Sequence, residues 1–290
     1  PEGAVLLHGQ KVEFEPLQIG PSTSIVGDSA GNVWIATERD GVTRYHPETL
    51  YRAFRDGLPS TRVHVVYLDH DGKLLAGTSK GAARLDGRKF ARFPDAEINR
   101  TEVLALAQDR KGTYWFCTNK GLFTFDGQSA SAVSDAPAVL DNATAICLAG
   151  SGDLWFATTE GAIRFDGQTY QTYTTQQGLP SNRVNAVLQA GPDLLLGTSQ
   201  GLVRFTDPRF ESFPSQQALT DNVRAVYYDR SGRYWFGTNQ GVFHHEHGKT
   251  TLLELNQRRF APTKVVAFAE DDAGDLWFGT DDVYVARLTP

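Results

Sequence analysis

Trp235-Phe-Gly-Thr238 is one of seven related segments that recur along this chain of 290 residues. Successive copies place their threonines 40 to 42 residues apart, and all five tryptophans of the protein occupy the first position of a copy. A period of about 40 residues is the length of a β-propeller blade. The other copies are Trp34-Ile-Ala-Thr37, Leu75-Ala-Gly-Thr78, Trp115-Phe-Cys-Thr118, Trp155-Phe-Ala-Thr158, Leu195-Leu-Gly-Thr198 and Trp277-Phe-Gly-Thr280.

Each copy contains four short segments with β-type sequence. The first is apolar, as in Val223-Arg-Ala-Val-Tyr227, and a turn such as Asp229-Arg-Ser-Gly232 connects it to the Trp segment. A bend with a glycine such as Gly241 opens the third segment, which in several copies ends at Asp-Gly, as at Asp166-Gly167, a strong hairpin signal. The fourth is rich in aromatic residues, as in Tyr170-Gln-Thr-Tyr173. Because no stretch shows a sustained helical period, the sequence predicts an all-β, seven-bladed β-propeller with four antiparallel strands per blade.

The two ends of the chain are expected to share the last blade. The seventh copy supplies three strands, the last of them within Val283–Leu288, and then the chain stops. Residues around Lys11 to Glu15 align with the outer strand of other copies and should complete the seventh blade. This closure removes the open sheet edges of a linear array and makes residues 1–290 a single propeller domain. The alignment leaves residues 3–7 without an assigned strand.

Several recurring positions are interpreted as structural. The residue before each repeat Thr is small, as expected where neighbouring sheets approach closely, and the Trp rings should pack between blades. The two cysteines, Cys117 and Cys147, are expected to be buried free thiols rather than a disulfide. An aspartate nine residues before Thr is interpreted as a turn former rather than a catalytic carboxylate, at Asp69, Asp109, Asp229 and Asp271.

Composition and motifs exclude several classes of partner. The net charge is −6 without a Lys/Arg block, which argues against nucleic acid. The longest apolar runs are about five residues, too short to enter a bilayer as a spanning helix. The stretch His244-His245-Glu246-His247 is similar to a metal motif, but adjacent side chains of a strand point to opposite faces, which favours an ordinary hairpin. We find no phosphate loop, nucleophile elbow or metal motif, and therefore expect no cofactor and no metal.

Candidate binding residues gather on one rim of the predicted ring. In an antiparallel blade, the loops that lead into the blade and the bends after each Thr share this rim. The second residue of the inner strand varies between copies, as an asymmetric ligand would require: Thr23, His64, Leu104, Thr144, Asn185, Arg224 and Val266. Of these, His64, Asn185 and Arg224 are the strongest candidates, with Arg62, Arg183 and Lys264 in the loops and Lys80, Lys120 and Glu160 in the bends.

The mixed charges and amides of this rim suit a neutral or weakly anionic polyhydroxylated ligand. The alternative is a rim that is simply solvated. The remaining polar residues of the bends are Arg39, Asp40, Gln200, Gln240, Asp281 and Asp282.

The repeat resembles the two-component regulator propeller. The resemblance rests on Gly-x-Leu-Trp-Phe-Gly-Thr-x-x-Gly-Leu, on the Asp-Gly turns and on Gly178-Leu-Pro-Ser-Asn182, and it covers nearly the whole chain. It implies an extracytoplasmic sensor region of a bacterial signalling receptor, periplasmic or extracellular, often with saccharide ligands. It also implies a C-terminal output domain outside this chain and allows a homodimer. Because the chain begins at Pro1 and contains no Met, we expect its native start, with any signal peptide, to lie outside this sequence.

Three functions remain open at this level. The first is a sensor module, without enzymatic activity, that perceives a small polar ligand, such as an oligosaccharide, at the central funnel. The second is a propeller lyase similar to streptogramin or polysaccharide lyases, with His64 as the well-placed histidine and Glu102 as its neighbour. The third is a scaffold that binds another protein.

Overall fold

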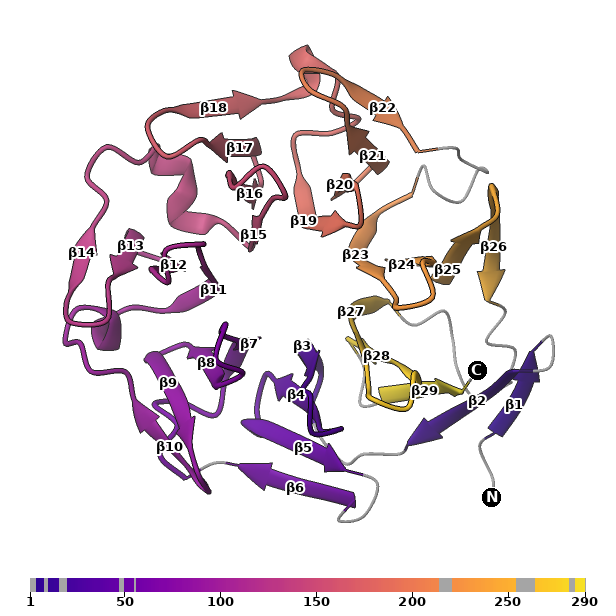
Figure 1. The fold of residues 1–290 in the computed structure, drawn as a ribbon, viewed down its shortest axis with the longest axis horizontal. Coiled ribbons are helices and arrows are strands. Elements are labelled where there is room, and N and C mark those ends of the chain that lie inside the picture. Colours follow the sequence, from indigo (N-terminus) through magenta and orange to yellow (C-terminus); the bar gives the residue numbers. More distant parts are fainter. Residues whose placement is uncertain are drawn as a thin grey trace.

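Seven antiparallel sheets surround a common axis in the computed structural model, and each repeat copy forms one blade (Figure 1). The structure describes residues 4–7, 10–15, 20–46, 50–54, 56–213, 221–253, 264–281 and 285–289. Blades 1 to 6 contain four strands each in simple sequential order, and blade 7 contains five. The prediction of an all-β, seven-bladed propeller is therefore confirmed.

Each blade runs from the axis of the ring to its outside. The innermost strands are β3 (Ser22–Gly27), β7 (Val63–Leu68), β11 (Val103–Gln108), β15 (Ala145–Leu148), β19 (Val184–Ala190), β23 (Val223–Tyr228) and β27 (Val265–Glu270). The second strands, which carry the repeat Trp or Leu, are β4 (Val33–Thr37), β8 (Leu74–Thr78), β12 (Tyr114–Thr118), β16 (Leu154–Thr158), β20 (Asp193–Thr198), β24 (Tyr234–Thr238) and β28 (Leu276–Thr280).

The outer half of each blade follows the same order. The third strands are β5 (Val42–His46), β9 (Gly81–Asp86), β13 (Gly121–Phe125), β17 (Gly161–Phe165), β21 (Gly201–Phe205), β25 (Gly241–Glu246) and β29 (Val285–Thr289). The fourth strands of blades 1 to 6 are β6 (Leu50–Phe54), β10 (Lys89–Arg92), β14 (Ala130–Ala132), β18 (Tyr170–Tyr173), β22 (Phe210–Ser212) and β26 (Lys249–Leu253). Short 3-10 turns occupy η1 (Ile98–Arg100), η2 (Ala138–Asn142) and η3 (Thr175–Gln177).

The N-terminal segment completes blade 7, as predicted. Strand β2 (Gln10–Glu15) pairs antiparallel with β29, with Lys11 opposite Thr289 and Glu15 opposite Val285. Strand β1 (Ala4–Leu7), which the sequence left unassigned, pairs with β2 and forms a fifth, outermost strand. Segments from both ends of the chain therefore lie in one sheet (Figure 1).

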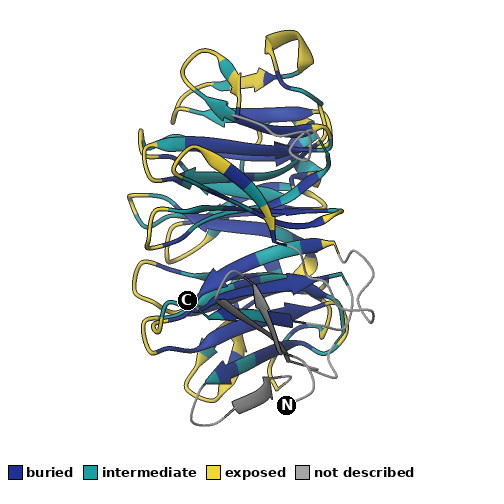
Figure 2. Ribbon diagram, turned by 90° about the vertical axis from the view of Figure 1, so that its right-hand side faces the viewer, coloured by how far each residue is buried: buried dark blue, intermediate teal, exposed yellow. Residues whose placement is uncertain are grey.

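Apolar residues fill the spaces between neighbouring blades. Trp277 of blade 7 is fully buried against Ile25, Val33 and Ile35 of blade 1, and its ring centroid lies 4.5 Å from that of Tyr45. Equivalent clusters place the other repeat tryptophans against the next blade. Viewed edge-on, the strands are buried through the thickness of the ring and the turns on its two faces are exposed (Figure 2). The predicted packing of the Trp rings between blades is confirmed.

The small residue before each repeat Thr marks a close approach between blades. A Cβ atom added at Gly77 would lie 2.7 Å from Val103 Cγ1 of the next blade, and one at Gly279 would lie 2.7 Å from Ser22 Cβ of blade 1. Heavy-atom contacts of this length are repulsive, because carbon atoms pack best at about 3.5–4.0 Å. Close approach of neighbouring sheets therefore explains why this position is small in every copy.

The repeat aspartate forms the turn after the innermost strand and also fixes the tryptophan. Asp271 Oδ1 accepts the backbone N–H groups of Ala273 and Asp275, both at 3.0 Å, and its Oδ2 accepts the indole N–H of Trp277 at 2.8 Å. The turn assignment is confirmed, and the second role of the carboxylate is new. The same carboxylate–indole bond joins Asp28 to Trp34, Asp109 to Trp115 and Asp229 to Trp235.

Three side chains link turns of neighbouring blades on this same face. Each belongs to a residue at or next to the end of an innermost strand, and each accepts a backbone N–H from the turn of the preceding blade. These bonds connect blades 2 and 3, blades 4 and 5, and blades 6 and 7. They are His70 N–H to Gln108 Oε1 at 2.9 Å, Gly150 N–H to Gln189 Oε1 at 2.8 Å, and Arg230 N–H to Glu270 Oε2 at 2.9 Å.

The cysteines and the histidine cluster are structural. Both cysteines are free thiols, as predicted, but only Cys117 is fully buried, whereas Cys147 is partly exposed. Burial raises the pKa of each, that of Cys147 to about 11, so the thiols stay protonated and poorly reactive at neutral pH. His244 stacks on Trp235 with ring centroids 5.3 Å apart, whereas His245 packs edge-on against Phe213 at 4.8 Å. Neighbouring histidines thus point to opposite faces of the strand, as the hairpin interpretation requires.

Candidate functional site

The varying second residue of the innermost strand coincides with a β-bulge. In six blades the register between the first two strands shifts at this residue, whereas in blade 4 Thr144 lies just before β15. A bulge leaves one residue unpaired and redirects its side chain. All seven residues are at least partly exposed. We call this set the bulge ring: Thr23, His64, Leu104, Thr144, Asn185, Arg224 and Val266.

Several members of the bulge ring reach the innermost strand of the next blade. Thr23 Oγ1 donates a hydrogen bond to Val63 O at 2.7 Å. Asn185 Nδ2 donates to Val223 O at 2.9 Å and to Asn222 Oδ1 at 2.7 Å. These contacts fix the side chains in place, so that polar groups on this rim are held in position without a ligand.

His64 and Glu102 come together, as the lyase hypothesis expected. His64 Nε2 lies 2.8 Å from Glu102 Oε1, and both side chains are partly exposed, at 22% and 31%. The contact joins two charged groups when the imidazole is protonated, but its geometry is not that of a hydrogen bond. The backbone N–H of Glu102 also donates to Asn119 Oδ1 at 3.0 Å. An imidazole beside a carboxylate is a pair that can take part in acid–base chemistry.

The basic residues of the rim are distributed around the ring and do not gather at one point. Arg224 Nε donates to Asn239 Oδ1 in its own blade at 2.7 Å, and Arg183 Nε lies 3.4 Å from Asn185 Oδ1. Lys264 Nζ forms an ion pair with Asp281 Oδ2 at 3.0 Å.

Other rim residues face solvent in separate blades. Among the described residues we find no hydrogen bond or ion pair to the side chains of Arg62, Lys80, Lys120 and Glu160, which are all exposed. Asp282 lies outside the described residues.

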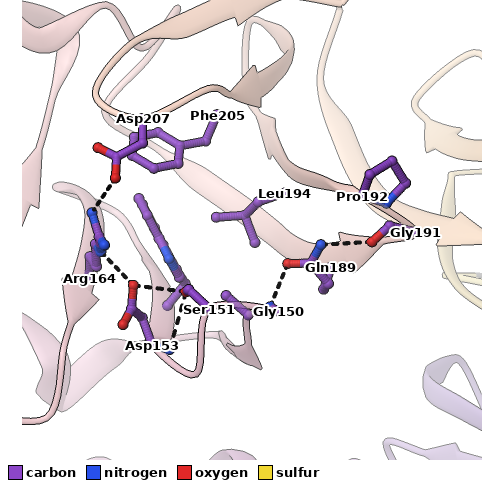
Figure 3. A pocket seen from close by; sticks show the side chains of 12 residues that line it. Gly150, Ser151, Asp153, Arg164, Gln189, Gly191, Pro192, Leu194, Phe205 and Asp207 are labelled. Atoms are coloured by element: carbon purple, nitrogen blue, oxygen red, sulfur yellow. Dashed lines mark hydrogen bonds and ion pairs between the residues drawn. The ribbon is translucent and has the colours of Figure 1, made fainter.

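Two cavities lined by described residues lie on the face of the ring opposite the bulge ring. The sequence analysis did not predict them. A cavity of about 360 Å³ lies between blades 4 and 5, where Arg164 bridges Asp153 and Asp207 (Figure 3). A second, of about 380 Å³, lies between blades 3 and 4 and includes Asp109 and Trp115. Both are bordered by the turns between first and second strands and between third and fourth strands. The sequence carried one signal for the first cavity, the alanine at position 149 where most copies have Asp.

The comparisons with known proteins agree with this architecture. Residues 218–240 and 260–282 match the two-component regulator propeller family. These two segments therefore carry the two-component regulator propeller repeat. No curated protein sequence matches the chain. No helix in the described part of the propeller is long and apolar enough to cross a membrane.

Two solved structures illustrate the range of proteins that share this propeller fold. The extracellular domain of a hybrid two-component system from B. thetaiotaomicron superposes with a TM-score of 0.80 at 20% identity. That match covers 94% of this chain but only 39% of the other. A catalytically inactive variant of virginiamycin B lyase from Staphylococcus aureus, solved with quinupristin, superposes with a TM-score of 0.75 at 12% identity, covering 97% and 99% of the two chains. Likenesses at these identities establish the fold alone.

Proposed function

We propose that this propeller is the ligand-sensing module of a bacterial signal-transduction receptor and lies outside the cytoplasm, in the periplasm or at the cell exterior. It perceives a small polar ligand of saccharide type at the rim that carries the bulge ring. A C-terminal output domain outside this chain receives the signal. The module itself carries out no reaction.

The observation that carries this proposal is the bulge ring itself. The scaffold positions repeat in every blade, whereas the bulged residue differs from blade to blade and presents an imidazole, an amide, a guanidinium or an aliphatic group. Bonds such as Asn185 Nδ2 to Val223 O hold these groups in fixed positions. Preorganised polar groups of mixed character suit the hydroxyl groups of a sugar. The regulator propeller repeats and the receptor domain of similar fold support the signalling role.

Isothermal titration with neutral and weakly anionic mono- and oligosaccharides tests the proposal. We expect one class to bind, and Arg224→Ala and Asn185→Ala each to weaken binding by about tenfold, the loss of one or two hydrogen bonds. Arg92→Ala, an exposed arginine on the outer strand β10, is the matched control and should bind as the wild type does. Absence of binding across the panel, or equal losses for Arg92→Ala and Arg224→Ala, contradicts the proposal.

A second candidate function follows from the contact between His64 and Glu102. In a propeller lyase of the streptogramin type this pair would supply acid–base chemistry on the same rim. The lyase requires that His64→Ala abolish turnover of a cyclic depsipeptide or a uronic glycan while the unfolding curve stays unchanged. If the wild type turns over none of these substrates, the lyase is excluded and the sensor is favoured.

A further inference from the structure

Blade 4 lacks the carboxylate that completes the turn in other tryptophan blades. Its repeat Asp is replaced by Ala149, while Trp155 is retained. In blade 7 the corresponding Asp271 accepts three N–H groups, those of Ala273, Asp275 and the Trp277 indole. Blade 4 keeps the three matching donors, which belong to Ser151, Asp153 and Trp155.

These three donors lack a carboxylate acceptor. Trp155 is 1% exposed, and its indole N–H has no hydrogen-bond acceptor among the described residues. The N–H of Ser151 likewise has none in the described ranges, and that of Asp153 reaches only Ser151 Oγ, at 3.4 Å. Trp155 lines the cavity between blades 4 and 5, so an acceptor from outside the protein can reach its indole N–H. Because the other four tryptophans donate to an Asp of their own blade, Trp155 differs from every other repeat tryptophan.

Blade 7 shows that a carboxylate can lie beside an arginine–aspartate ion pair like the one in blade 4. Arg164 Nε donates to Asp153 Oδ2 at 2.7 Å, and Arg287 Nε donates to Asp275 Oδ2 at 2.6 Å in the same arrangement. In blade 7 the Asp271 carboxylate stands beside that ion pair. Blade 4 differs in the second partner of the arginine, because Arg164 Nη1 lies 3.2 Å from Asp207 Oδ2 whereas Arg287 Nη1 lies 3.4 Å from the Tyr45 hydroxyl. A carboxylate placed beside Asp153 therefore meets the same arginine–aspartate pair as in blade 7, with one more carboxylate nearby.

The three donors border the cavity of about 360 Å³ between blades 4 and 5. Its other wall comes from blade 5, with Leu194 and Phe205 as apolar groups and Gln189 and Asp207 as polar ones (Figure 3). The cavity extends well beyond the volume of a single carboxylate group. In the neighbouring cavity Asp109 already accepts the indole N–H of Trp115 at 3.0 Å, so the same donors are occupied there.

We propose that this cavity binds a small carboxylic acid, whose carboxylate takes the position of the missing aspartate. One oxygen accepts the indole N–H of Trp155 and the other accepts the N–H groups of Ser151 and Asp153. The remainder of the acid lies against Leu194 and Phe205. This site is on the face opposite the bulge ring, so it does not depend on the saccharide proposal.

Indole N–H signals in a ¹H–¹⁵N correlation spectrum test the site directly. The protein has five tryptophans, and Trp155→Phe assigns the Trp155 signal by its loss. Titration with sodium acetate should move this signal alone, downfield and to saturation, because the indole gains a charged acceptor. Sodium chloride at the same ionic strength is the control. Failure of the Trp155 signal to move with acetate, or an equal movement with chloride, overturns the proposal.

Two complementary variants separate a carboxylate site from general salt effects. Ala149→Asp supplies the carboxylate internally and should weaken acetate binding by about tenfold or more. Asp271→Ala creates the same arrangement in blade 7, and the Trp277 signal should then respond to acetate as Trp155 does. Unchanged acetate binding in Ala149→Asp overturns the proposal. If Ala149→Asp does not fold, the Asp271→Ala titration decides, and a Trp277 signal that ignores acetate counts against the site.

Repeating the titration with glycolate, lactate and gluconate identifies the preferred acid. If the cavity wall formed by Leu194 and Phe205 contributes, an acid larger than acetate should bind at least several-fold more tightly. Equal affinity for all acids overturns the role assigned to that wall.

Discussion

Blades 6 and 2 have Trp235 and Leu75 at the same repeat position. The carboxylate of their buried turn aspartate receives its side-chain hydrogen bond from different donors. In blade 6 the indole N–H of Trp235 donates to Asp229 Oδ2 at 2.8 Å, so the donor comes from the same blade. In blade 2 the leucine has no donor, and the Tyr114 hydroxyl of blade 3 donates to Asp69 Oδ2 at 2.7 Å. The carboxylate has an aromatic donor in both cases. The difference teaches that a leucine blade obtains from its neighbour what a tryptophan blade supplies itself.

Blade 5, the other leucine blade, obtains its donor from the next blade as well. Leu195 again lacks an N–H, and the Tyr234 hydroxyl of blade 6 donates to Asp193 Oδ2 at 2.8 Å. This carboxylate is not the turn aspartate, whose position holds Gln189 in blade 5, but the first residue of β20. Burial and the facing carboxylate raise the pKa of both Tyr114 and Tyr234 well above the ordinary tyrosine value, so each hydroxyl remains a donor at neutral pH. Both blades that have Leu at the repeat tryptophan position therefore receive a tyrosine hydrogen bond from the next blade.

Removing an indole should have the largest effect. Trp235→Ala is expected to reduce the free energy of unfolding by about 3–5 kcal/mol, because it opens a cavity between blades 6 and 7 and removes the indole N–H that donates to Asp229 Oδ2. Urea denaturation measures the loss. Trp235→Leu should recover part of the packing but still lack the indole donor to Asp229 Oδ2. A loss below about 1 kcal/mol for Trp235→Ala would mean that the ring is not held by this packing.

Replacing Asp229 by alanine should reduce the free energy of unfolding more than replacing Asp69. Asp229→Ala leaves three kinds of donor unpaired, the Trp235 indole, the backbone of the turn and the Arg233 guanidinium, which lies 2.7 Å from Asp229 Oδ2. We expect a loss of about 3 kcal/mol, against about 2 kcal/mol for Asp69→Ala, which has no such ion pair. Denaturation of both variants checks the order. A larger loss for Asp69→Ala would contradict it.

The hydroxyl from the neighbouring blade should have the smallest effect. Tyr114→Phe is expected to cost about 1.5 kcal/mol, the low end for one hydrogen bond to a charged group, while the ring keeps its packing. A double-mutant cycle with Asp69→Ala isolates the bond, because the two losses should not add. Tyr227→Phe, whose pKa burial raises to about 12, provides a control without this carboxylate bond. Additive losses for Tyr114→Phe and Asp69→Ala would show that the bond contributes nothing.

Sequence alone was sufficient for the scaffold because its positions are determined by contacts that recur. Trp277, Gly279 and Thr280 appear in related form in every blade, since each blade meets the next in the same way. Ring closure by Lys11 to Glu15 followed from the same alignment. The contact between His64 and Glu102 was also predictable, because both lie at the start of neighbouring innermost strands.

Features that occur in only some blades were not predictable in this way. The donor from Tyr114 to Asp69 joins residues 45 positions apart, and its need arises only where Trp is replaced by Leu. The bulge at His64 could not be predicted from the type of residue, because the same position in other blades carries Thr, Leu, Asn, Arg or Val. Among the described residues, the indole N–H of Trp155 lacks an acceptor because Ala149 replaces the aspartate found in the other tryptophan blades. Such features follow from particular combinations of side chains across an interface.

The sharing of blade 7 between β2 and β29 bears on how the molecule comes apart. A linear repeat array can lose its terminal repeats one at a time, because each end has a neighbour on one side only. Here every blade has two neighbours, and no blade can detach without breaking two interfaces. We therefore expect the ring to unfold as a whole rather than from one end. Amide hydrogen exchange in the innermost strands should then show one opening event that is shared by all seven blades.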